Sequence, residues 1–333
     1  MDKLRIGLCG CGNMGGSLAA GLVGTEEAAL VAVADVIPER AAAMADKYDA
    51  QPLDSLDKLL AVPGLDGVII AVPGYLHAPL TIQAAQAGKN IFVEKPMALH
   101  VADCQAMIRA ARESGVKLMV GQVLRRYEPY RSILRWLDEG RYGQVRAASI
   151  WRITDGRRWA VPGYWRAKHA LSGGYLLEVG AHELDMLRCL MGAPEMVNAL
   201  SRKFLDRDHE VTDYIHVQIG FSRGGAASYE GGGGTSISRY GFRIYMDGAT
   251  LVSDAAFDPK AMKVYDMEGQ EVSTEGEFSP DKPVQGELAN WLAALRGEAE
   301  VAVPGEEGLG TVALAEAAYR SAELGRPVRY EIG

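Results

Sequence analysis

Short apolar runs alternate with alanine-rich stretches through the first part of the chain. The apolar runs span residues 4–9, 30–35, 67–72, 90–95 and 117–122, and the stretches between them span residues 14–24, 38–48, 77–88 and 101–115. Runs that are apolar throughout indicate strands buried on both faces, and helices that connect such strands imply a parallel sheet. The alternation therefore predicts a doubly wound α/β domain over residues 1–122.

The pattern changes after Gln122. A helix is predicted over residues 129–140, a long strand over 144–153 and a helix from Glu178 to Met191, followed by alternating polar and apolar runs between Gly and Asp turns. Clustered strands without helices between them favour an α+β domain with a largely antiparallel open sheet, over residues 123–333. The helices expected at 285–297 and 305–325 can pack back on the first domain. The run Gly231 to Gly234 is interpreted as a flexible loop.

Composition narrows the class of protein. A chain of 333 residues is long for a single core, so two domains are expected. The formal charge of −8 argues against a nucleic-acid or anionic-membrane partner, because either requires a basic surface. No apolar run approaches the roughly 20 residues of a membrane span, and the N-terminus leads directly into a strand without room for a signal peptide. The cytoplasm is the expected compartment, and the four cysteines are read as reduced thiols.

A glycine signature opens the first domain. Gly10, Gly12 and Gly15, with Asn13 and Met14 between them, fit G-x-G-x-x-G at the point where a predicted strand passes into a helix. Such glycines permit a tight turn and let the backbone approach a pyrophosphate at the helix N-terminus, as in a Rossmann-type domain.

The next predicted strand ends on Asp35, 20 residues beyond Gly15. A carboxylate at this place accepts hydrogen bonds from the ribose hydroxyls of NAD and repels the 2′-phosphate of NADP. NAD is therefore favoured over NADP. The alternative is a tight turn followed by a surface aspartate without a cofactor.

The stretch IFVEKPM, residues 91–97, ends a buried strand on a charged pair and a proline. In a parallel sheet, ligands bind at the carboxyl ends of the strands, so Lys95 is expected in the crevice that holds the nicotinamide. A lysine partly desolvated beside a cationic ring has a lowered pKa, which suits proton transfer near neutrality. Pro96 fixes the turn, through a cis bond or a trans one. The alternative is a solvated lysine at a strand end.

Residues 71–129, with "AVPGYLHAPL" and "VEKPMALH", resemble the glucose–fructose oxidoreductase, inositol dehydrogenase and rhizopine-catabolism family. The likeness includes "SGGYLLEVGAHELDMLRCLMG" and extends through nearly the whole chain. It implies an NAD(P)-dependent dehydrogenase of sugars, cyclitols or similar polyols, with Lys95 as the lysine of the family's EKP motif. The candidate cofactor residues that accompany it are Val72, Pro73, His77, Glu94 and Gln122. Gly74 departs from the family, which often has Asn there, so a side-chain contact to the cofactor can be missing.

A second set of polar residues, Glu178, His182 and Asp185, has the spacing i, i+4 and i+7, which puts them on one face of a helix. The resemblance implies that His182 is an acid or base, a role that suits an unperturbed pKa near 6.5. Family members usually have aspartate where Glu178 stands, so its reach differs. Two alternatives stay open: a capping carboxylate with a core histidine, and a zinc site, for which no further ligand is evident.

The segment after the long strand is rich in Trp and Arg. Trp159, Tyr164 or Trp165 is expected to flank the ring of a sugar-like ligand, with Arg166 or Lys168 reaching its hydroxyl or carboxylate groups. Arg125, just past the last strand of the first domain, lies where a residue that faces the substrate would fit, and Asp185 is a further candidate for substrate binding. The alternatives are a solvated basic loop and a subunit contact.

These residues together predict an NAD-dependent oxidoreductase that acts on a carbinol carbon of a sugar, cyclitol or related polyol. His182 takes the hydroxyl proton, Lys95 hydrogen-bonds the same oxygen, and Glu178 orients the histidine or the nicotinamide. Two alternatives remain: an NAD-dependent enzyme that cleaves glycosides through transient oxidation, and a dinucleotide-sensing regulator without catalysis. An exposed face of the second sheet would favour a homodimer or homotetramer.

Overall fold

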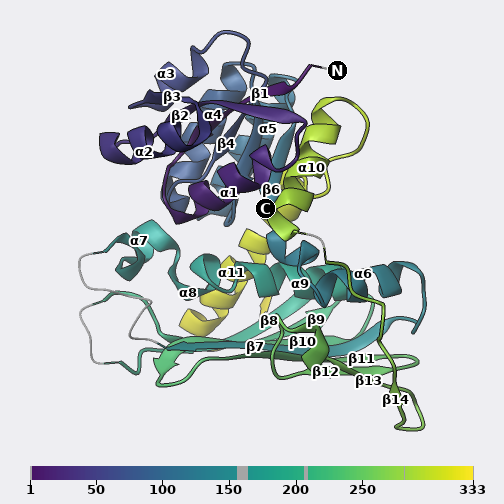
Figure 1. Ribbon diagram of the computed structural model, residues 1–333. Helices are drawn as coiled ribbons and strands as arrows, with labels where there is room; N and C mark the ends of the chain where they lie inside the picture. The colour runs from purple at the N-terminus through teal and green to yellow at the C-terminus, as the bar shows by residue number, and fades with distance from the viewer. Residues whose placement is uncertain (1, 156–163, 206–208, 281, 333) are drawn as a thin grey trace. The chain divides into compact units, whose positions relative to one another are not determined.

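The computed structural model (Figure 1) describes the chain except for residues 1, 156–163, 206–208, 281 and 333. The chain divides into two compact units. Unit 1 comprises Met1–Val123 and Asp281–Leu309, and unit 2 comprises Leu124–Pro280 and Gly310–Gly333. Each unit therefore uses two separate segments of the sequence.

Unit 1 contains a parallel sheet of six described strands in the order β3-β2-β1-β4-β5-β6. The strands are β1 (Leu4–Cys9), β2 (Ala28–Ala34), β3 (Gln51–Leu53), β4 (Gly67–Ile70), β5 (Asn90–Glu94) and β6 (Leu118–Gly121). This strand order is that of the dinucleotide-binding doubly wound fold, so the prediction for the first domain's fold is confirmed. The edge strand β3 was not predicted, because three residues that include a proline give no periodic signal.

Helices cover the sheet of unit 1, and one of them comes from the far end of the sequence. They are α1 (Asn13–Val23), α2 (Pro38–Tyr48), α3 (Leu56–Leu60), α4 (His77–Gln86), α5 (Val101–Glu113) and α10 (Pro283–Leu295). In α10, Leu288, Trp291 and Leu292 are fully buried and belong to the same core as Leu18 of α1. Trp291 meets Phe92 of β5 edge-on, with ring centroids 5.8 Å apart. The segment 281–309 thus completes the core of unit 1.

Unit 2 contains a sheet of nine described strands in the order β14-β13-β12-β11-β7-β10-β9-β8-β15. The strands are β7 (Val145–Asp155), β8 (Pro194–Arg202), β9 (Tyr214–Phe221), β10 (Ala226–Thr235), β11 (Arg239–Met246), β12 (Thr250–Ser253), β13 (Lys263–Tyr265), β14 (Glu271–Val272) and β15 (Val328–Arg329). Neighbouring strands are antiparallel except β7 and β10. The predicted largely antiparallel sheet is confirmed.

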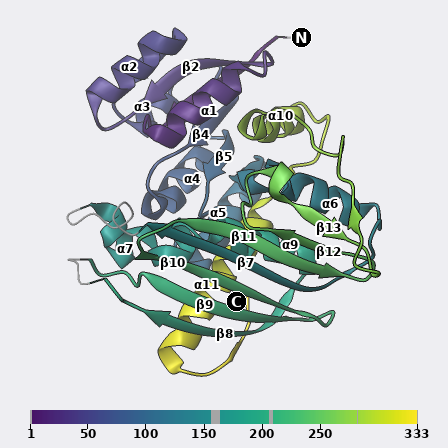
Figure 2. The same cartoon turned by 60° about the horizontal axis from the view of Figure 1, so that its bottom comes forward.

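Helices α6 (Tyr130–Asp138), α9 (Ala181–Met191) and α11 (Gly305–Leu324) gather on one face of this sheet (Figure 1 and Figure 2). Inward residues of β7, such as Ala148 and Ile150, alternate with outward ones and are buried beneath the helices. The face of the sheet that these helices cover is therefore the core of unit 2.

The glycine run 231–234 is not a loop, so that interpretation is wrong. Gly231 and Gly232 lie inside β10 and pair with β7 on one side and β9 on the other. A Cβ on Gly231 would lie 2.5 Å from the Tyr229 hydroxyl and 2.7 Å from the Tyr175 ring. Glycine is used here because two buried tyrosines close over the strand, not because the chain turns.

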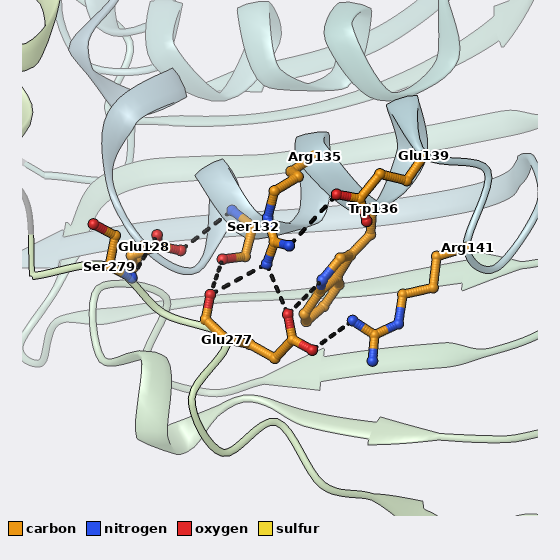
Figure 3. Close-up of polar contacts among 8 residues, drawn as sticks. All are labelled: Glu128, Ser132, Arg135, Trp136, Glu139, Arg141, Glu277 and Ser279. Atoms are coloured by element: carbon orange, nitrogen blue, oxygen red, sulfur yellow. Dashed lines mark hydrogen bonds and ion pairs between the residues drawn. The ribbon is translucent and has the colours of Figure 1, made fainter.

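The segment that follows β14 is fastened to α6 by Glu277 (Figure 3). The Glu277 carboxylate accepts hydrogen bonds from Arg135 at 2.7 Å, Arg141 at 2.6 Å and the Trp136 indole at 3.2 Å. Its backbone carbonyl accepts from the Ser132 hydroxyl at 3.1 Å. The Arg141 and Arg135 guanidiniums lower the pKa of Glu277 to about 2. Ser132, Arg135 and Trp136 of α6, together with Arg141 just beyond it, thus hold this irregular segment in place.

Candidate cofactor and active site

The glycine turn between β1 and α1 requires glycine at two positions and is open at a third. Gly10 has a φ of +101°, and a Cβ there would lie 2.3 Å from the Ala71 carbonyl oxygen. A Cβ on Gly15 would lie 1.9 Å from the carbonyl oxygen of Gly10. Gly12 faces open space at the N-terminus of α1, which no side chain of the described residues caps. Open backbone N–H groups at a helix N-terminus fit a pyrophosphate.

Asp35 lies at the end of β2 with both carboxylate oxygens fixed. Oδ2 accepts from the Cys11 backbone N–H at 2.7 Å, and Oδ1 accepts from the Ile37 backbone N–H at 2.9 Å. The carboxylate is thereby tied to the glycine turn. Burial, followed by the charge of Asp35, raises the pKa of the Cys11 thiol to about 12, so this cysteine stays protonated and unreactive.

His77 ties the turn after β4 to the turn after β5. Its Nδ1 lies 2.7 Å from the Pro96 carbonyl oxygen, and its Nε2 lies 2.8 Å from the Val72 carbonyl oxygen. The ring is buried, so it supports the turn from inside the unit. Gly74 also closes on this turn, because a Cβ there would lie 3.3 Å from Leu99 and 3.4 Å from Pro96.

Lys95 follows β5 with its side chain partly exposed, and the Lys95–Pro96 peptide bond is cis. The Lys95 backbone N–H donates to Glu94 Oε2 at 3.1 Å. Glu94 and Gln122 are buried beneath the carboxyl end of the sheet, whereas Val72 and Pro73 are partly exposed. Asn13 and Met14 are exposed in the first turn of α1. The predicted cofactor residues of unit 1 therefore line the carboxyl ends of β1, β2, β4, β5 and β6.

The helix expected from about Glu178 to Met191 is confirmed from Ala181 onward, but its predicted start is wrong. The helix α8 (Gly174–Glu178) ends at Glu178, and α9 begins at Ala181 after the N-cap residue Gly180. A Cβ on Gly180 would lie 2.9 Å from the Tyr229 hydroxyl. Glu178 and His182 thus flank a break between two helices instead of sharing one helical face.

Glu178 is paired with Arg166. The Arg166 Nε donates to Glu178 Oε1 at 2.5 Å. Arg166 lies in the short 3₁₀ helix η3 (Trp165–Ala167), and its guanidinium lies over the rings of Trp165 and Tyr164. These two aromatic residues were predicted to flank a sugar, and Tyr164 is exposed while Trp165 is partly exposed. Trp159, the third aromatic candidate, lies outside the described residues.

Asp185 is buried in an ion pair instead of facing solvent. Its carboxylate accepts two hydrogen bonds from Arg125, Nε to Oδ2 and Nη2 to Oδ1, both at 2.7 Å. Thr311 adds a third at 3.2 Å. The two residues expected to contact substrate therefore contact each other. Because the Asp185 side chain is only 1% exposed, the geometry favours a positioning role for it over direct substrate binding.

A second buried ion pair on α9 was not anticipated. Arg152 of β7 donates to Glu183 Oε1 at 3.0 Å, and the Glu183 side chain is fully buried. Arg152 follows Ala148 and Ile150 on the inward face of β7, and a charge at such a position needs a partner. The alternation along β7 could have shown that Arg152 points inward and needs a partner, although it does not identify that partner as Glu183. Two arginines from different elements thus fix α9 around the partly exposed His182.

Lys95 belongs to unit 1, whereas Glu178 and His182 belong to unit 2. The approach of these side chains to one substrate stays a prediction. Within the described ranges, no three His, Cys, Asp or Glu side chains gather closely enough to hold a metal ion. Among the described helices, none combines the length and the apolar character that crossing a membrane requires.

Comparison with known proteins covers both units. Residues 4–122 match the model of an oxidoreductase family with an NAD-binding Rossmann fold, and residues 135–330 match that family's C-terminal alpha/beta domain. Inositol 2-dehydrogenase of Rhizobium meliloti (strain 1021) is 30% identical over 329 residues, which cover 96% of each chain.

Two solved structures share the fold over the whole length. An aldose-aldose oxidoreductase from Caulobacter crescentus, complexed with glycerol, has a TM-score of 0.89 at 28% identity, covering 98% of this chain and 100% of that one. The WlbA dehydrogenase from Bordetella pertussis, in complex with NADH and UDP-GlcNAcA, has a TM-score of 0.86 at 27% identity, covering 99% of both chains. With both family domains matched in order, this chain belongs to the glucose–fructose oxidoreductase, inositol dehydrogenase and rhizopine-catabolism family of oxidoreductases.

Proposed function

We propose that the protein is an NAD-dependent dehydrogenase that oxidises a carbinol carbon of a sugar, cyclitol or related polyol. The observation that carries the proposal is the glycine turn with Asp35 fixed beside it, in a chain that belongs to an oxidoreductase family. The relative named inositol 2-dehydrogenase and the structural neighbour named aldose-aldose oxidoreductase support polyols and sugars as the substrate class. When bound, NAD supplies a hydride acceptor at its nicotinamide ring.

The residues that would hold NAD fit its chemistry. Gly12 and the N-terminus of α1 would face the pyrophosphate, and Asp35 would accept hydrogen bonds from the adenosine ribose. NAD is preferred to NADP in this proposal, because a 2′-phosphate would lie against the Asp35 carboxylate and like charges repel.

Three side chains are assigned to the chemistry. His182 takes the hydroxyl proton of the substrate, and Lys95 donates a hydrogen bond to the same oxygen and stabilises its developing charge. Glu178 orients His182 or the nicotinamide. The carbinol carbon loses a hydride as its oxygen loses a proton, which leaves a carbonyl. The assignment requires residues of both units to act on one substrate.

Single-turnover hydride transfer in the variants Lys95→Met and His182→Ala tests these roles. Loss of a positioned proton acceptor or donor lowers the rate by about 10²- to 10⁴-fold. The matched controls are Lys263→Met and His216→Ala, which alter residues on the strands β13 and β9 of unit 2 and are expected to retain wild-type rates. If both test variants bind NAD and transfer hydride at wild-type rates, the roles assigned to Lys95 and His182 are wrong. If a glycoside is cleaved without NADH accumulation, the reaction is glycoside cleavage through transient oxidation and not net oxidation.

Assembly and location complete the proposal. The sheet of unit 2 exposes Leu200 and Tyr245 on the face opposite its helices, which supports a homodimer or homotetramer. The charge of −8 and the absence of a membrane-spanning helix among the described residues are compatible with the expected cytoplasmic location.

A further inference from the structure

Arg166 is held in one orientation by three neighbours. Its Nε donates to Glu178 Oε1 at 2.5 Å, and its Cζ lies 4.7 Å from the ring centroid of Trp165 and 5.5 Å from that of Tyr164. The two rings are 5.7 Å apart and inclined by 49°. Because a guanidinium is planar and stacks on aromatic faces, these contacts fix both its position and its plane.

The bond to Glu178 uses only one edge of the guanidinium. Among the described residues, neither Nη nitrogen of Arg166 has a hydrogen-bond or ion-pair partner. The two Nη nitrogens together form a fork that matches the two oxygens of a carboxylate. An oriented guanidinium with that edge unused is a ready site for a planar anion.

The burial of this pair is asymmetric. The Arg166 side chain is 39% exposed and that of Glu178 only 10%, so the pair presents its cation to the surroundings and keeps its anion inside. The Arg125–Asp185 and Arg152–Glu183 pairs are arranged in the same way, with exposures of 17% against 1% and 25% against 0%. In all three pairs the arginine is the more exposed partner, and Arg166 is the most exposed of the three, so its guanidinium is the positive charge most open to an anion.

We propose that the substrate carries a carboxylate, as a uronic or aldonic acid does, and that Arg166 binds that carboxylate. The aromatic rings of Trp165 and Tyr164 provide the apolar surface against which a sugar ring packs. Glu178 orients the guanidinium through Nε and leaves its outer edge to the substrate. The inference rests on the proposed function, since it names the substrate class of the same site.

The experiment compares acids with neutral sugars of the same configuration. Rates of NAD reduction are measured with glucuronate against glucose, galacturonate against galactose, and gluconate against sorbitol. The wild-type protein is expected to prefer the acid in at least one pair. Arg166→Met is expected to lower kcat/KM for that acid by about 10- to 100-fold, chiefly through KM, because a charge-assisted hydrogen-bonded pair is lost. The neutral partner should lose less activity than the acid, because it makes no ion pair with Arg166 and is affected only through Glu178, so the ratio of the two kcat/KM values is the diagnostic quantity.

Two further variants keep the result interpretable. Arg166→Lys retains the charge but lacks the fork, so it is expected to fall between wild type and Arg166→Met. Arg146→Met serves as the matched control. It removes an arginine that pairs with Asp247, and both residues are distant in sequence from the break between α8 and α9. Thermal unfolding of each variant separates a binding defect from a folding defect.

The outcomes distinguish the inference from the function on which it rests. Oxidation of neutral sugars with no preference for acids, and no effect of Arg166→Met, would overturn the carboxylate site and leave the dehydrogenase in place. If calorimetry shows that an acid binds the wild-type protein but not Arg166→Met, while no sugar or acid is turned over, the carboxylate site is supported. The proposed dehydrogenase function is then overturned. If the wild-type protein neither binds nor turns over any of the acids, the inference is overturned.

Discussion

At the scale of single residues, the candidate cofactor site of unit 1 is shaped by backbone N–H donors as much as by side chains. The Asp35 carboxylate is fixed by two backbone N–H groups, one of them from the glycine turn itself. This arrangement holds the carboxylate in place, so the ribose contact proposed for it would require little ordering on binding. Asp35 is therefore the residue at which the proposed cofactor preference is tested, although its replacement by Asn also removes one acceptor of a backbone N–H.

Asp35→Asn keeps an acceptor oxygen and removes the negative charge. We expect the preference for NADH over NADPH to shrink about tenfold or more, because the repulsion of a 2′-phosphate disappears while one ribose contact is retained. Fluorescence titration with NADH and NADPH measures the two affinities. Asp46→Asn, on the exposed side of α2, is the matched control. Equal affinities for both cofactors in the wild-type protein would contradict the proposed preference.

Single residues also show where sequence reasoning ends. Gly10, Gly15 and Asp35 were predictable because each is required by a local backbone shape within a known strand–turn–helix pattern. The pairing of Arg152 with Glu183, 31 residues apart, depends on how β7 lies beneath α9, and no local signal contains that information. The same holds for Arg125 and Asp185, 60 residues apart, which were expected to face substrate.

At the scale of elements, the predictions succeeded where one face or both faces of an element are uniformly buried. The apolar runs of β1, β4 and β5 identified their strands, and the alternation in β9 and β11 identified theirs. The break between α8 and α9 was missed because apolar residues continue through it. At the break, a Cβ on Gly180 would lie 2.9 Å from the Tyr229 hydroxyl, so the packing of β10 requires glycine there. Packing between elements thus overrode a periodic pattern.

The segment fastened by Glu277 gives an element-scale prediction. Glu277→Gln is expected to lower the free energy of unfolding by about 1–2 kcal/mol at pH 7, since charged hydrogen bonds to Arg135 and Arg141 are weakened at a partly exposed site. The pKa of Glu277 is about 2 in the folded protein against an ordinary 4.5. Its contribution is therefore complete above pH 4.5 and is lost as the pH falls toward 2.

Chemical denaturation of both proteins between pH 7 and pH 3 checks this dependence. The difference between wild type and Glu277→Gln should narrow below about pH 4.5. Glu271→Gln, whose carboxylate pairs only with the half-exposed Lys263 among the described residues, is the control and should differ little from wild type. A difference that stays constant across the whole pH range would show that Glu277 contributes through shape and not through charge.

At the scale of the whole molecule, each unit is assembled from two segments of the chain. Helix α10 lies in the sequence between β14 and α11, which both belong largely to unit 2, yet its buried residues belong to the core of unit 1. The order of elements along the chain suggested only that C-terminal helices can pack back on the first domain. Which of them does so follows from the fit of Trp291 against Phe92 and Gly67.

Trp291→Ala is expected to destabilise unit 1 by about 3–5 kcal/mol, because it leaves a cavity in a closed core. Hydrogen exchange should then quicken in the strands β1, β4 and β5 while β7, β9 and β10 keep their protection. Trp151→Ala, on the outward face of β7, is the converse control and should leave exchange in unit 1 unchanged. Equal loss of protection in both sheets would mean that the two units unfold together.

The late position of α10 has a consequence for biosynthesis. When a ribosome has made the first 280 residues, every strand of the Rossmann sheet is already available, but Trp291 and its neighbours are still to be translated. The nascent protein must therefore carry an uncovered apolar surface on α1 and β5 until Leu288, Trp291 and Leu292 have been translated. Chaperone binding during translation should concentrate on that surface.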